Sequence, residues 1–267
     1  MLNTFIFKTE QNMKKIILTT VTIATICCLA CKESTVVTPA TTGTLTTGTN
    51  YGTLMQKAFS DYGNKTVTTS IDGNYLVVTT TTVPDHKSPY FASSNSQYEA
   101  YNGTGTFSKA PNAIAVGNIT FKIPISPVKA TTSQATPFGP IGVALNGVVF
   151  FNQYAAGGST LTNEIFGFDQ YGGHPQQQGQ YHYHVEPLYL TAKKGKDILL
   201  GFLTDGFPVY GPSENGKTVT TKDLDAYHGH TNATTEYPAG IYHYHITADD
   251  PYINGSGFYG TPGTVSK

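Results

Sequence analysis

Residues 142–152 read GVALNGVVFFN, and residues 201–211 read GFLTDGFPVYG. Each stretch is an apolar run interrupted by a short turn signal, Asn146-Gly147 in the first and Asp205-Gly206 in the second. Apolar, β-branched and aromatic residues on both sides of Asn-Gly or Asp-Gly indicate a β-hairpin. The sequence therefore predicts two hairpins of the same kind.

Two more motifs recur in the same order. The pattern D-x-Y-x-G-H at residues 169–174 returns at 225–230, and Tyr-His-Tyr-His at 181–184 returns at 242–245. Several motifs at a nearly constant offset indicate an internal repeat. We therefore expect two copies of one β unit that pack with pseudo-twofold symmetry. These units are residues 137–190 and 197–260.

The remaining chain adds strands rather than helices. Short β-branched and aromatic runs at 66–71, 75–83 and 119–125 are bounded by turn residues. The best short helix is 53–62, and no longer window has helical apolar spacing. We expect a mainly β fold, sandwich- or barrel-like, with a lead β segment at 51–130 that packs on the duplicated units.

The N-terminal region has the features of an export signal. Residues 13–31 contain two lysines, then an apolar stretch too short to span a bilayer, then small residues before Cys31. The ending LAC resembles a bacterial lipoprotein signal, in which the cysteine is lipidated; a plain secretory signal is the alternative. Residues 1–12 suggest a start codon assigned too early, and 32–50 predict a flexible Thr/Gly-rich tether. We expect an exported protein, lipid-anchored to the cell envelope only at Cys31, at the outer membrane or cell surface.

Composition limits the classes of partner and chemistry. The 267 residues carry a formal charge of −1, only 12% of them are charged, and every one of the 16 cationic residues is Lys. This balance argues against nucleic acid as a partner. All three cysteines, Cys27, Cys28 and Cys31, lie in the signal region, so a metal in the body must be held by nitrogen and oxygen.

The repeated strings carry a family resemblance. From about Val83 to Gly260 the chain resembles the YHYH protein family, in DHKSPY, NGVVFFN, DGFPVYGP, both YHYH strings and the closing PYINGSGFYG. This resemblance implies an exported bacterial domain. It implies little about activity, so the chemistry has to come from the residues.

Histidines are the strongest candidates for a site. Side chains alternate along a strand, so His182 and His184 share one face, with the tyrosines opposite. Two imidazoles at this spacing can converge on one ion. Six of the eight histidines lie at matched places of the two units: His174, His182, His184, His230, His243 and His245.

This pattern predicts a metal site of copper or zinc, with iron also compatible, because imidazole without thiolate suits all three. The two YHYH strands either meet in one shared centre or hold two. A metal-free histidine site and purely structural histidines are the alternatives. Glu186 continues the face of His184 and is a candidate carboxylate, whereas Thr247 takes its place in the second unit.

Four acidic residues are candidates for supporting roles. Asp205 and Glu186 are the candidate catalytic groups, since a carboxylate beside a metal can hold its bound water; Asp205 as a simple turn residue is the alternative. Asp169 and Asp225 either orient a ligand histidine or start an Asx turn. The YHYH tyrosines are expected in the core.

Two functions follow from these residues. The first is a metal-binding protein, or a hydrolytic or oxidative metalloenzyme, acting outside the cytoplasm on a small molecule or glycan. The second is a non-catalytic cell-surface binding module with structural histidines. His86, in the loop after residue 83, is a further candidate for the site.

Overall fold

A computed structural model describes residues 50–267. The expected signal peptide, the lipid site at Cys31 and all but the last residue of the expected tether lie outside the described residues. Within the described residues, no helix has both the length and the apolar character needed to cross a membrane.

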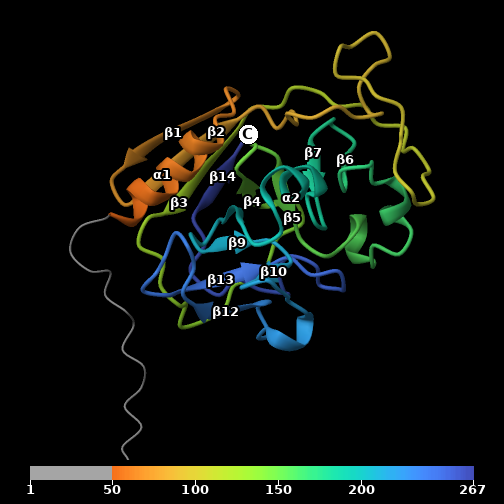
Figure 1. Cartoon of the computed structure of the whole chain (residues 1–267). Helices are drawn as coiled ribbons and strands as arrows, with labels where there is room; N and C mark the ends of the chain where they lie inside the picture. The colour runs from red at the N-terminus through yellow and green to blue at the C-terminus, as the bar shows by residue number, and fades with distance from the viewer. Residues whose placement is uncertain (1–49) are drawn as a thin grey trace, which may run out of the picture. The chain divides into compact units, whose positions relative to one another are not determined.

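The expectation of a mainly β fold is confirmed, with sandwich-like sheets and no closed barrel among the described residues (Figure 1). Four strands form one sheet in the order β1 (Val67–Asp72), β2 (Tyr75–Thr80), β3 (Ile119–Pro124) and β14 (Thr264–Ser266). Eight form a second sheet in the order β12 (Gly229–Asn232), β13 (Ile241–His245), β9 (Pro208–Tyr210), β8 (Leu199–Leu203), β4 (Pro140–Ala144), β5 (Val149–Phe151), β7 (Tyr181–Tyr183) and β6 (Gly173–Pro175). A small hairpin pairs β10 (Ser213–Glu214) with β11 (Lys217–Thr218).

The eight-stranded sheet has the same pairing pattern from either end. β4 and β8 pair antiparallel at its middle, and each forms an antiparallel hairpin, β4 with β5 and β8 with β9. The next pairs, β5 with β7 and β9 with β13, are parallel, and the outermost pairs are antiparallel. A duplication with pseudo-twofold symmetry predicts this order; the duplication itself stays a prediction.

Both predicted hairpin turns are present. Gly147 and Gly206, each the second residue of its turn signal, have φ angles of 83° and 91°. These left-handed conformations favour glycine, which has no Cβ to clash. The turns therefore form where the sequence places Asn-Gly and Asp-Gly.

Glycine also fixes the contact between the two central strands. A Cβ on Gly142 would meet the Phe202 carbonyl oxygen of β8, and a Cβ on Gly201 would meet the Val143 carbonyl oxygen of β4. The close approach of β4 and β8 thus depends on glycine on both strands.

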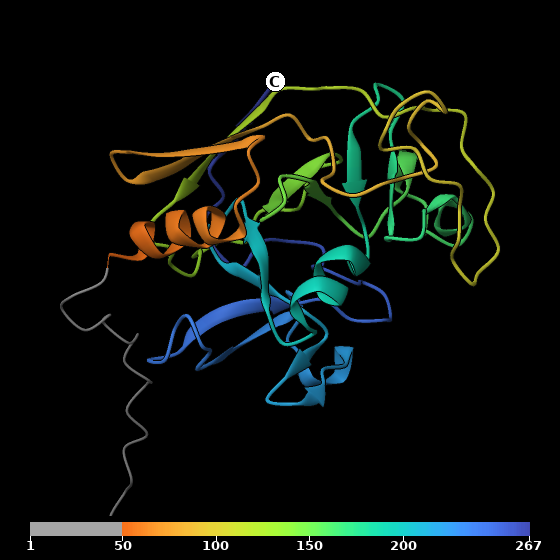
Figure 2. The same ribbon diagram turned by 45° about the horizontal axis from the view of Figure 1, so that its top comes forward.

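Two apolar clusters lie on opposite faces of the eight-stranded sheet. The first joins this sheet to the four-stranded sheet and to helix α1 (Tyr51–Tyr62), through residues such as Met55, Phe121 and Phe202. The second lies against helix α2 (Leu188–Lys194) and contains all four YHYH tyrosines. Figure 2 shows α1 beside the four-stranded sheet and α2 away from it, where Leu190 of α2 packs on the eight-stranded sheet.

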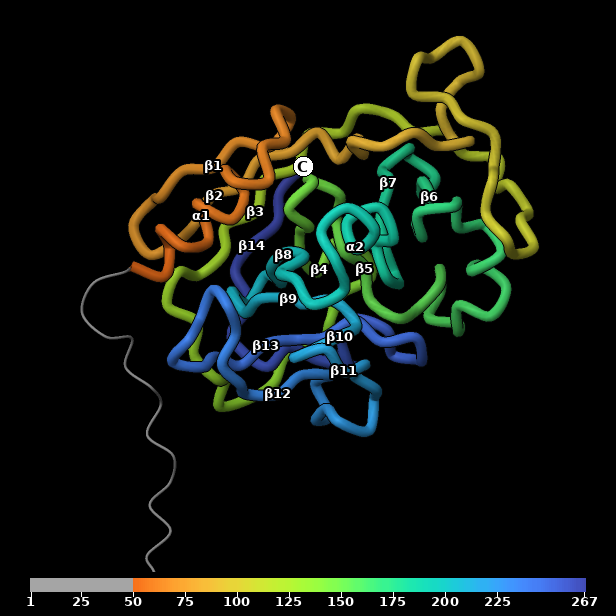
Figure 3. The backbone as a smooth tube through the Cα atoms, in the orientation of Figure 1, coloured from red at the N-terminus to blue at the C-terminus, as the bar shows by residue number. Residues whose placement is uncertain are grey.

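The lead segment matches its predicted elements. Helix α1 covers the expected 53–62, and Asn50 caps its start by accepting a hydrogen bond from the backbone N–H of Gly52. The sheet of this segment is completed by β14, from the other end of the described chain. Residues 81–118, between β2 and β3, run as a long loop past β6 and β7 (Figure 3), where Ala115 N–H donates to the Gly179 carbonyl.

Candidate metal centres

The predicted alternation of the YHYH strands is confirmed. Tyr181 and Tyr183 are buried in the apolar cluster beside α2, while His182 and His184 point to the opposite face. The second string behaves in the same way, with Tyr242 and Tyr244 in the core. The expectation that the tyrosines belong to the core therefore holds.

The first cluster combines β6, β7 and a 3₁₀ turn. His174 lies opposite His182 across the β6–β7 pair, and their Nε2 atoms are 3.1 Å apart. The Nε2 atoms of His182 and His184 are 3.0 Å apart. Glu164, in the turn Glu164–Gly167, brings its Oε1 to 3.0 Å from His174 Nε2 and 3.6 Å from His184 Nε2. We call these four residues centre one.

The second cluster repeats this geometry on β12 and β13. His230 lies opposite His243 with 3.2 Å between their Nε2 atoms, and His245 Nε2 is 3.1 Å from His243 Nε2. Glu214, at the end of β10, brings its Oε1 to 3.3 Å from His243 Nε2 and 3.5 Å from His230 Nε2. We call these four residues centre two.

Backbone carbonyls orient the YHYH rings. His182 Nδ1 lies 3.1 Å from the Gln180 oxygen, and His243 Nδ1 lies 2.9 Å from the Ile241 oxygen. His184 and His245 hydrogen-bond through Nδ1 in the same way, to the carbonyls of Asn152 and Gly211. A carbonyl only accepts, so each Nδ1 carries the proton and donates it, which leaves a lone pair on Nε2. Four lone pairs thus face the two cluster centres, two in each.

The distances fit a cation in each cluster. Metal bonds of about 2.0 Å in a tetrahedron place neighbouring ligand atoms about 3.3 Å apart. The ligand atoms of each cluster all lie within 4.8 Å of one another, and neighbouring ligand atoms are 3.0–3.6 Å apart. Glu214 Oε1 is buried without a hydrogen-bond partner, although such atoms are normally satisfied. A bound cation would satisfy it.

Burial keeps the ligand groups in the protonation states that metals require. Burial lowers the pKa of His184 and of His245 to about 4, and lowers the pKa of His182 and His243, helped in both by neighbouring imidazoles. Burial alone would raise the pKa of Glu164, but the hydrogen bond with His174 and the nearby His184 lower it below its usual value. At neutral pH the four YHYH imidazoles are therefore neutral and Glu164 is a carboxylate, as metal binding requires.

The interpretation that both YHYH strands share one centre is wrong for the described residues. β13 and β7 are separated in the sheet by β9, β8, β4 and β5. Each string therefore has its own cluster, on strands that lie near opposite ends of the sheet, β7 and β6 at one end and β13 and β12 at the other (Figure 1). The reason is that β4 and β8 form the central pair, which places the repeated YHYH strands far out on either side.

Glu186 does not join centre one. Strand β7 ends at Tyr183, so side-chain alternation does not continue to residue 186. Glu186 instead accepts a hydrogen bond from the Thr191 hydroxyl of α2 at 2.6 Å. The carboxylate of centre one is Glu164.

Asp205 lies in the turn between β8 and β9 and contacts neither cluster. It is fully buried, and its carboxylate accepts hydrogen bonds from the Tyr244 hydroxyl at 2.6 Å and from the backbone N–H groups of Gly260 and Phe207. Burial raises its pKa to about 6, against these hydrogen bonds. Its predicted position in a hairpin turn is confirmed.

Asp169 and Asp225 each hold a YHYH tyrosine rather than a ligand histidine. Tyr181 donates to Asp169 Oδ1 at 2.8 Å, and Tyr242 donates to Asp225 Oδ1 at 2.8 Å. Both carboxylates also accept the backbone N–H two residues later, as in an Asx turn. The Asx-turn interpretation is therefore confirmed, and backbone carbonyls orient the YHYH histidines instead.

His86 lies outside both clusters. It is buried among aromatic rings, its Nε2 lies 3.2 Å from the Tyr183 hydroxyl, and its Nδ1 lies 2.9 Å from the Lys87 carbonyl. Burial lowers its pKa. His86 thus packs behind the YHYH strand, on its tyrosine side.

The sequence did not single out Glu164 or Glu214. Neither belongs to a repeated motif, and they come from different local structures, a 3₁₀ turn and a β-hairpin. Their separation along the chain also differs from that of the histidine motifs. Only the folded chain brings them to matched positions.

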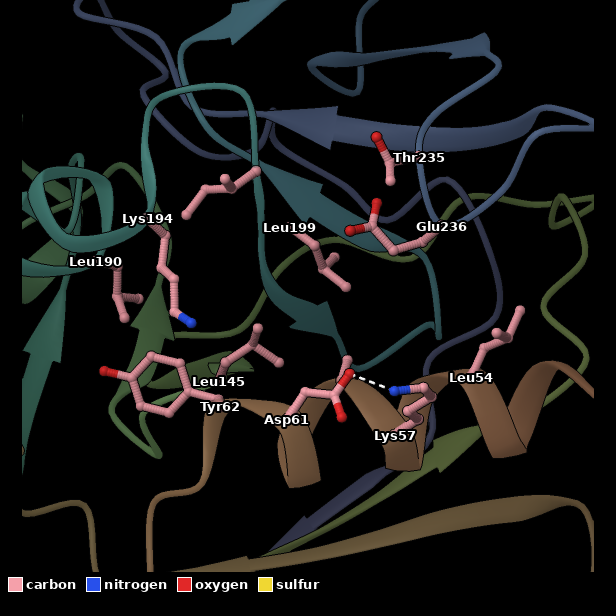
Figure 4. Close-up of a pocket in the computed structure, with 12 residues that line it drawn as sticks. Leu54, Lys57, Asp61, Tyr62, Leu145, Leu190, Lys194, Leu199, Thr235 and Glu236 are labelled. Carbon is pink, nitrogen blue, oxygen red and sulfur yellow. Dashed lines mark hydrogen bonds and ion pairs between the residues drawn. The ribbon is translucent and has the colours of Figure 1, made fainter.

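Each centre borders a pocket. One of about 390 Å³ includes His182 and His184 in its lining, and one of about 350 Å³ includes His243 and His245. A third cavity of about 410 Å³ contains no histidine and lies between α1 and β8 (Figure 4). There the Lys57–Asp61 ion pair of 2.6 Å lies beside an apolar wall that includes Leu199. The two pockets that border centres one and two give small ligands access to both histidine clusters.

Comparison with known families identifies the family of this chain. The family described as YHYH protein matches residues 120–220 and 213–257, more than half of the chain. The matched region holds all eight residues of the two centres: Glu164, His174, His182, His184, Glu214, His230, His243 and His245. No curated protein and no solved structure matches the chain.

Proposed function

The chain belongs to the YHYH protein family. We propose that it is an exported protein and that its two clusters bind two transition-metal ions, each held by three histidines and one glutamate. Zn²⁺ is the ion proposed, with Cu²⁺ as its competitor, because imidazole and carboxylate without thiolate suit both. The site residues are those of centres one and two.

The observation that carries this proposal is the convergence of Nε2 atoms. In each centre the two YHYH histidines commit Nδ1 to a backbone carbonyl and direct Nε2 to the same point. Hydrogen bonding of the second ring nitrogen is the usual support of a histidine that ligates a metal.

The proposed role of the metals is structural rather than catalytic. Structural zinc sites take all four ligands from the protein, whereas catalytic sites leave a position for water or substrate. Centres one and two each offer four protein ligands. The metals when bound would supply cross-links, and neither Asp205 nor Glu186 is needed for this role.

The position of the centres supports such a role. β6 and β12 are the two edge strands of the eight-stranded sheet, and each pairs with only one neighbour in it. Centre one joins edge strand β6 to β7 and to the turn with Glu164; centre two joins β12 to β13 and to β10. A metal at each end would fasten the edges of the sheet.

Export and a lipid anchor at Cys31 complete the proposal. They are supported by the apolar stretch and the LAC ending of residues 13–31. The protein would then be a metal-stabilised binding module in the cell envelope.

Elemental analysis of the full chain tests the metal proposal. The protein is purified without chelator and without a histidine tag, and metal is counted per chain in wild type, His182→Ala, His243→Ala and the double variant. We expect about two equivalents in wild type, one fewer in each single variant, and none in the double variant.

A matched control is His86→Gln, which changes a buried histidine outside both centres and should keep both ions. Wild-type protein that contains no metal and takes up none from added Zn²⁺ or Cu²⁺ would overturn the proposal. Wild-type protein that holds only one equivalent, lost completely in His182→Ala and equally in His243→Ala, would contradict two separate centres.

A further inference from the structure

The pocket beside centre one contains a buried polar group with no partner. Gln180 lines this pocket, is only 6% exposed, and its Oε1 has no hydrogen-bond partner. It immediately precedes β7 and lines the same pocket as His182, two residues on. A buried carboxamide oxygen without a partner costs free energy unless something in the pocket binds it.

The second unit shows that this carboxamide is not required to build a centre. The residue before the second YHYH string is Ile241, and its carbonyl accepts from His243 Nδ1 just as the Gln180 carbonyl accepts from His182 Nδ1. The backbone does the same work in both units, while the side chain is polar in one and apolar in the other. The Gln180 side chain is therefore not needed to orient the His182 ring.

The rest of this pocket mixes apolar walls with carboxamides and carries little charge. Gln176 and Gln178 lie in its lining, and Glu164 is already engaged with His174 and His184. Lys267 is the remaining charged residue in the lining. The pocket beside centre two is different, since Asp197, Glu214 and Glu236 all line it. The two pockets therefore differ in charge.

Aromatic rings complete the first pocket. Phe138, in its lining, is 69% exposed, and its ring centroid is 6.4 Å from that of Tyr154. Phe151 forms another part of the wall and stacks on the His182 ring at 4.0 Å. An exposed ring beside carboxamides offers an apolar surface for C–H groups and donors and acceptors for hydroxyls.

From these features we infer that the 390 Å³ pocket beside centre one binds a neutral saccharide, with Gln180 as a residue that determines specificity. A saccharide has apolar C–H faces and neutral hydroxyls that both donate and accept, so it matches the carboxamides and the exposed Phe138 ring. The volume is within the range of small-molecule sites. The inference goes beyond the proposed metal binding and does not require the metal.

Binding to immobilised glycans tests this inference. Full-length protein loaded with Zn²⁺ is applied to an array of neutral oligosaccharides, which also carries sialylated and amino-sugar glycans as charged probes. The affinity for each neutral glycan that binds the protein is then measured by calorimetry. We expect at least one neutral glycan to bind, with affinity at least tenfold lower in Gln180→Ile, which installs the residue of the second unit. Phe138→Ala at the pocket mouth should also weaken binding.

Asp197→Asn is the matched control, because it changes an exposed residue of the other pocket and should leave the affinity unchanged. Metal is counted on the same samples, and Gln180→Ile should retain both ions. Glycan binding without metal would overturn the proposed function and leave this inference standing. Binding of only charged glycans, binding of none, or binding unaffected by Gln180→Ile would overturn the inference.

Discussion

The Nε2 atoms of His182 and His184 lie 3.0 Å apart, while Nδ1 of each ring faces a backbone carbonyl. With the ring protons committed to the carbonyls, two lone pairs face each other inside the protein. Such a contact is unfavourable unless a proton or a cation lies between the nitrogens. His243 and His245 repeat it at 3.1 Å. Metal binding and stability are therefore expected to be coupled.

The first prediction is that chelation lowers the melting temperature. A metal present at 100 times its dissociation constant stabilises the folded state by about 2.7 kcal/mol per site, which corresponds to roughly 5–10 °C for a domain of this size. Differential scanning calorimetry with and without a strong chelator measures the shift. The His182→Ala/His243→Ala double variant should show no shift, and an unchanged wild-type melting temperature would contradict the prediction.

The second prediction concerns the glutamates. Glu164→Gln should weaken metal binding at centre one alone, and Glu214→Gln at centre two alone, because each change removes the only carboxylate of its cluster. We expect the metal affinity of that centre to fall by about 100-fold. This is the upper end of the loss caused by changing residues that only support a ligand, and the glutamates are proposed as ligands themselves. Competition titration with a chromogenic chelator measures it. Glu186→Gln should behave as wild type; a loss there instead of at Glu164 would contradict the assignment.

The sequence predicts those parts of the site that depend on local geometry. Turn signals place Gly147 and Gly206 at left-handed positions, and strand alternation places His182 and His184 on one face. These features involve residues within a few positions of each other, so a pattern can reveal them. The same holds for α1, which the structure extends to Tyr51.

Features that depend on distant segments could not be predicted. Glu164 and Glu214 reach their histidines from a 3₁₀ turn and a hairpin with no shared motif. Glu186 does not continue the face of His184 as expected, because β7 ends at Tyr183 and the Glu186 carboxylate accepts from Thr191 of α2. The separation of the two centres depends on β4 and β8 pairing at the middle of the sheet, which is a property of topology.

The third prediction tests the structural role of the YHYH tyrosines. Tyr181→Phe removes the hydroxyl that donates to buried Asp169, so it should lower the free energy of unfolding by about 1–2 kcal/mol. Metal content should remain at two equivalents, because Tyr181 faces the core and not the cluster. Denaturant unfolding and elemental analysis on the same preparation measure both. Loss of one metal without loss of stability would show that the tyrosine acts at the centre.

The fourth prediction concerns the anchor. Cys31→Ser should move the protein from the membrane fraction to the soluble exported fraction and abolish incorporation of radiolabelled fatty acid, because the lipid is attached through the cysteine sulfur. Cys28→Ser is the matched control and should remain labelled, since the LAC ending is kept. Membrane retention and labelling of Cys31→Ser would indicate that the anchor lies elsewhere.

The fifth prediction follows from Asp205. Burial raises its pKa to about 6 in the folded protein, whereas an unfolded aspartate has a pKa of about 3.9. Between these values the folded state binds more protons than the unfolded state. Stability therefore falls as pH rises from about 4 to 6, and above that range the buried carboxylate costs roughly 2–3 kcal/mol.

Asp205→Asn should remove this dependence, because an amide cannot ionise. The matching turn already contains an amide: Asn146 donates to the Tyr183 hydroxyl at 3.1 Å, where Asp205 accepts from the Tyr244 hydroxyl. The amide lacks the second carboxylate oxygen, which accepts from the Gly260 N–H in the wild type. At low pH the variant should therefore have a lower free energy of unfolding than the wild type. What should change is the difference in unfolding free energy between variant and wild type, which we expect to move in favour of the variant by about 2 kcal/mol between pH 4.5 and 8. Urea unfolding of chelated protein at both pH values measures this difference, with chelation keeping metal release out of the comparison. A difference that stays constant across the range would mean that Asp205 titrates near its unfolded pKa and that its three hydrogen bonds outweigh its burial.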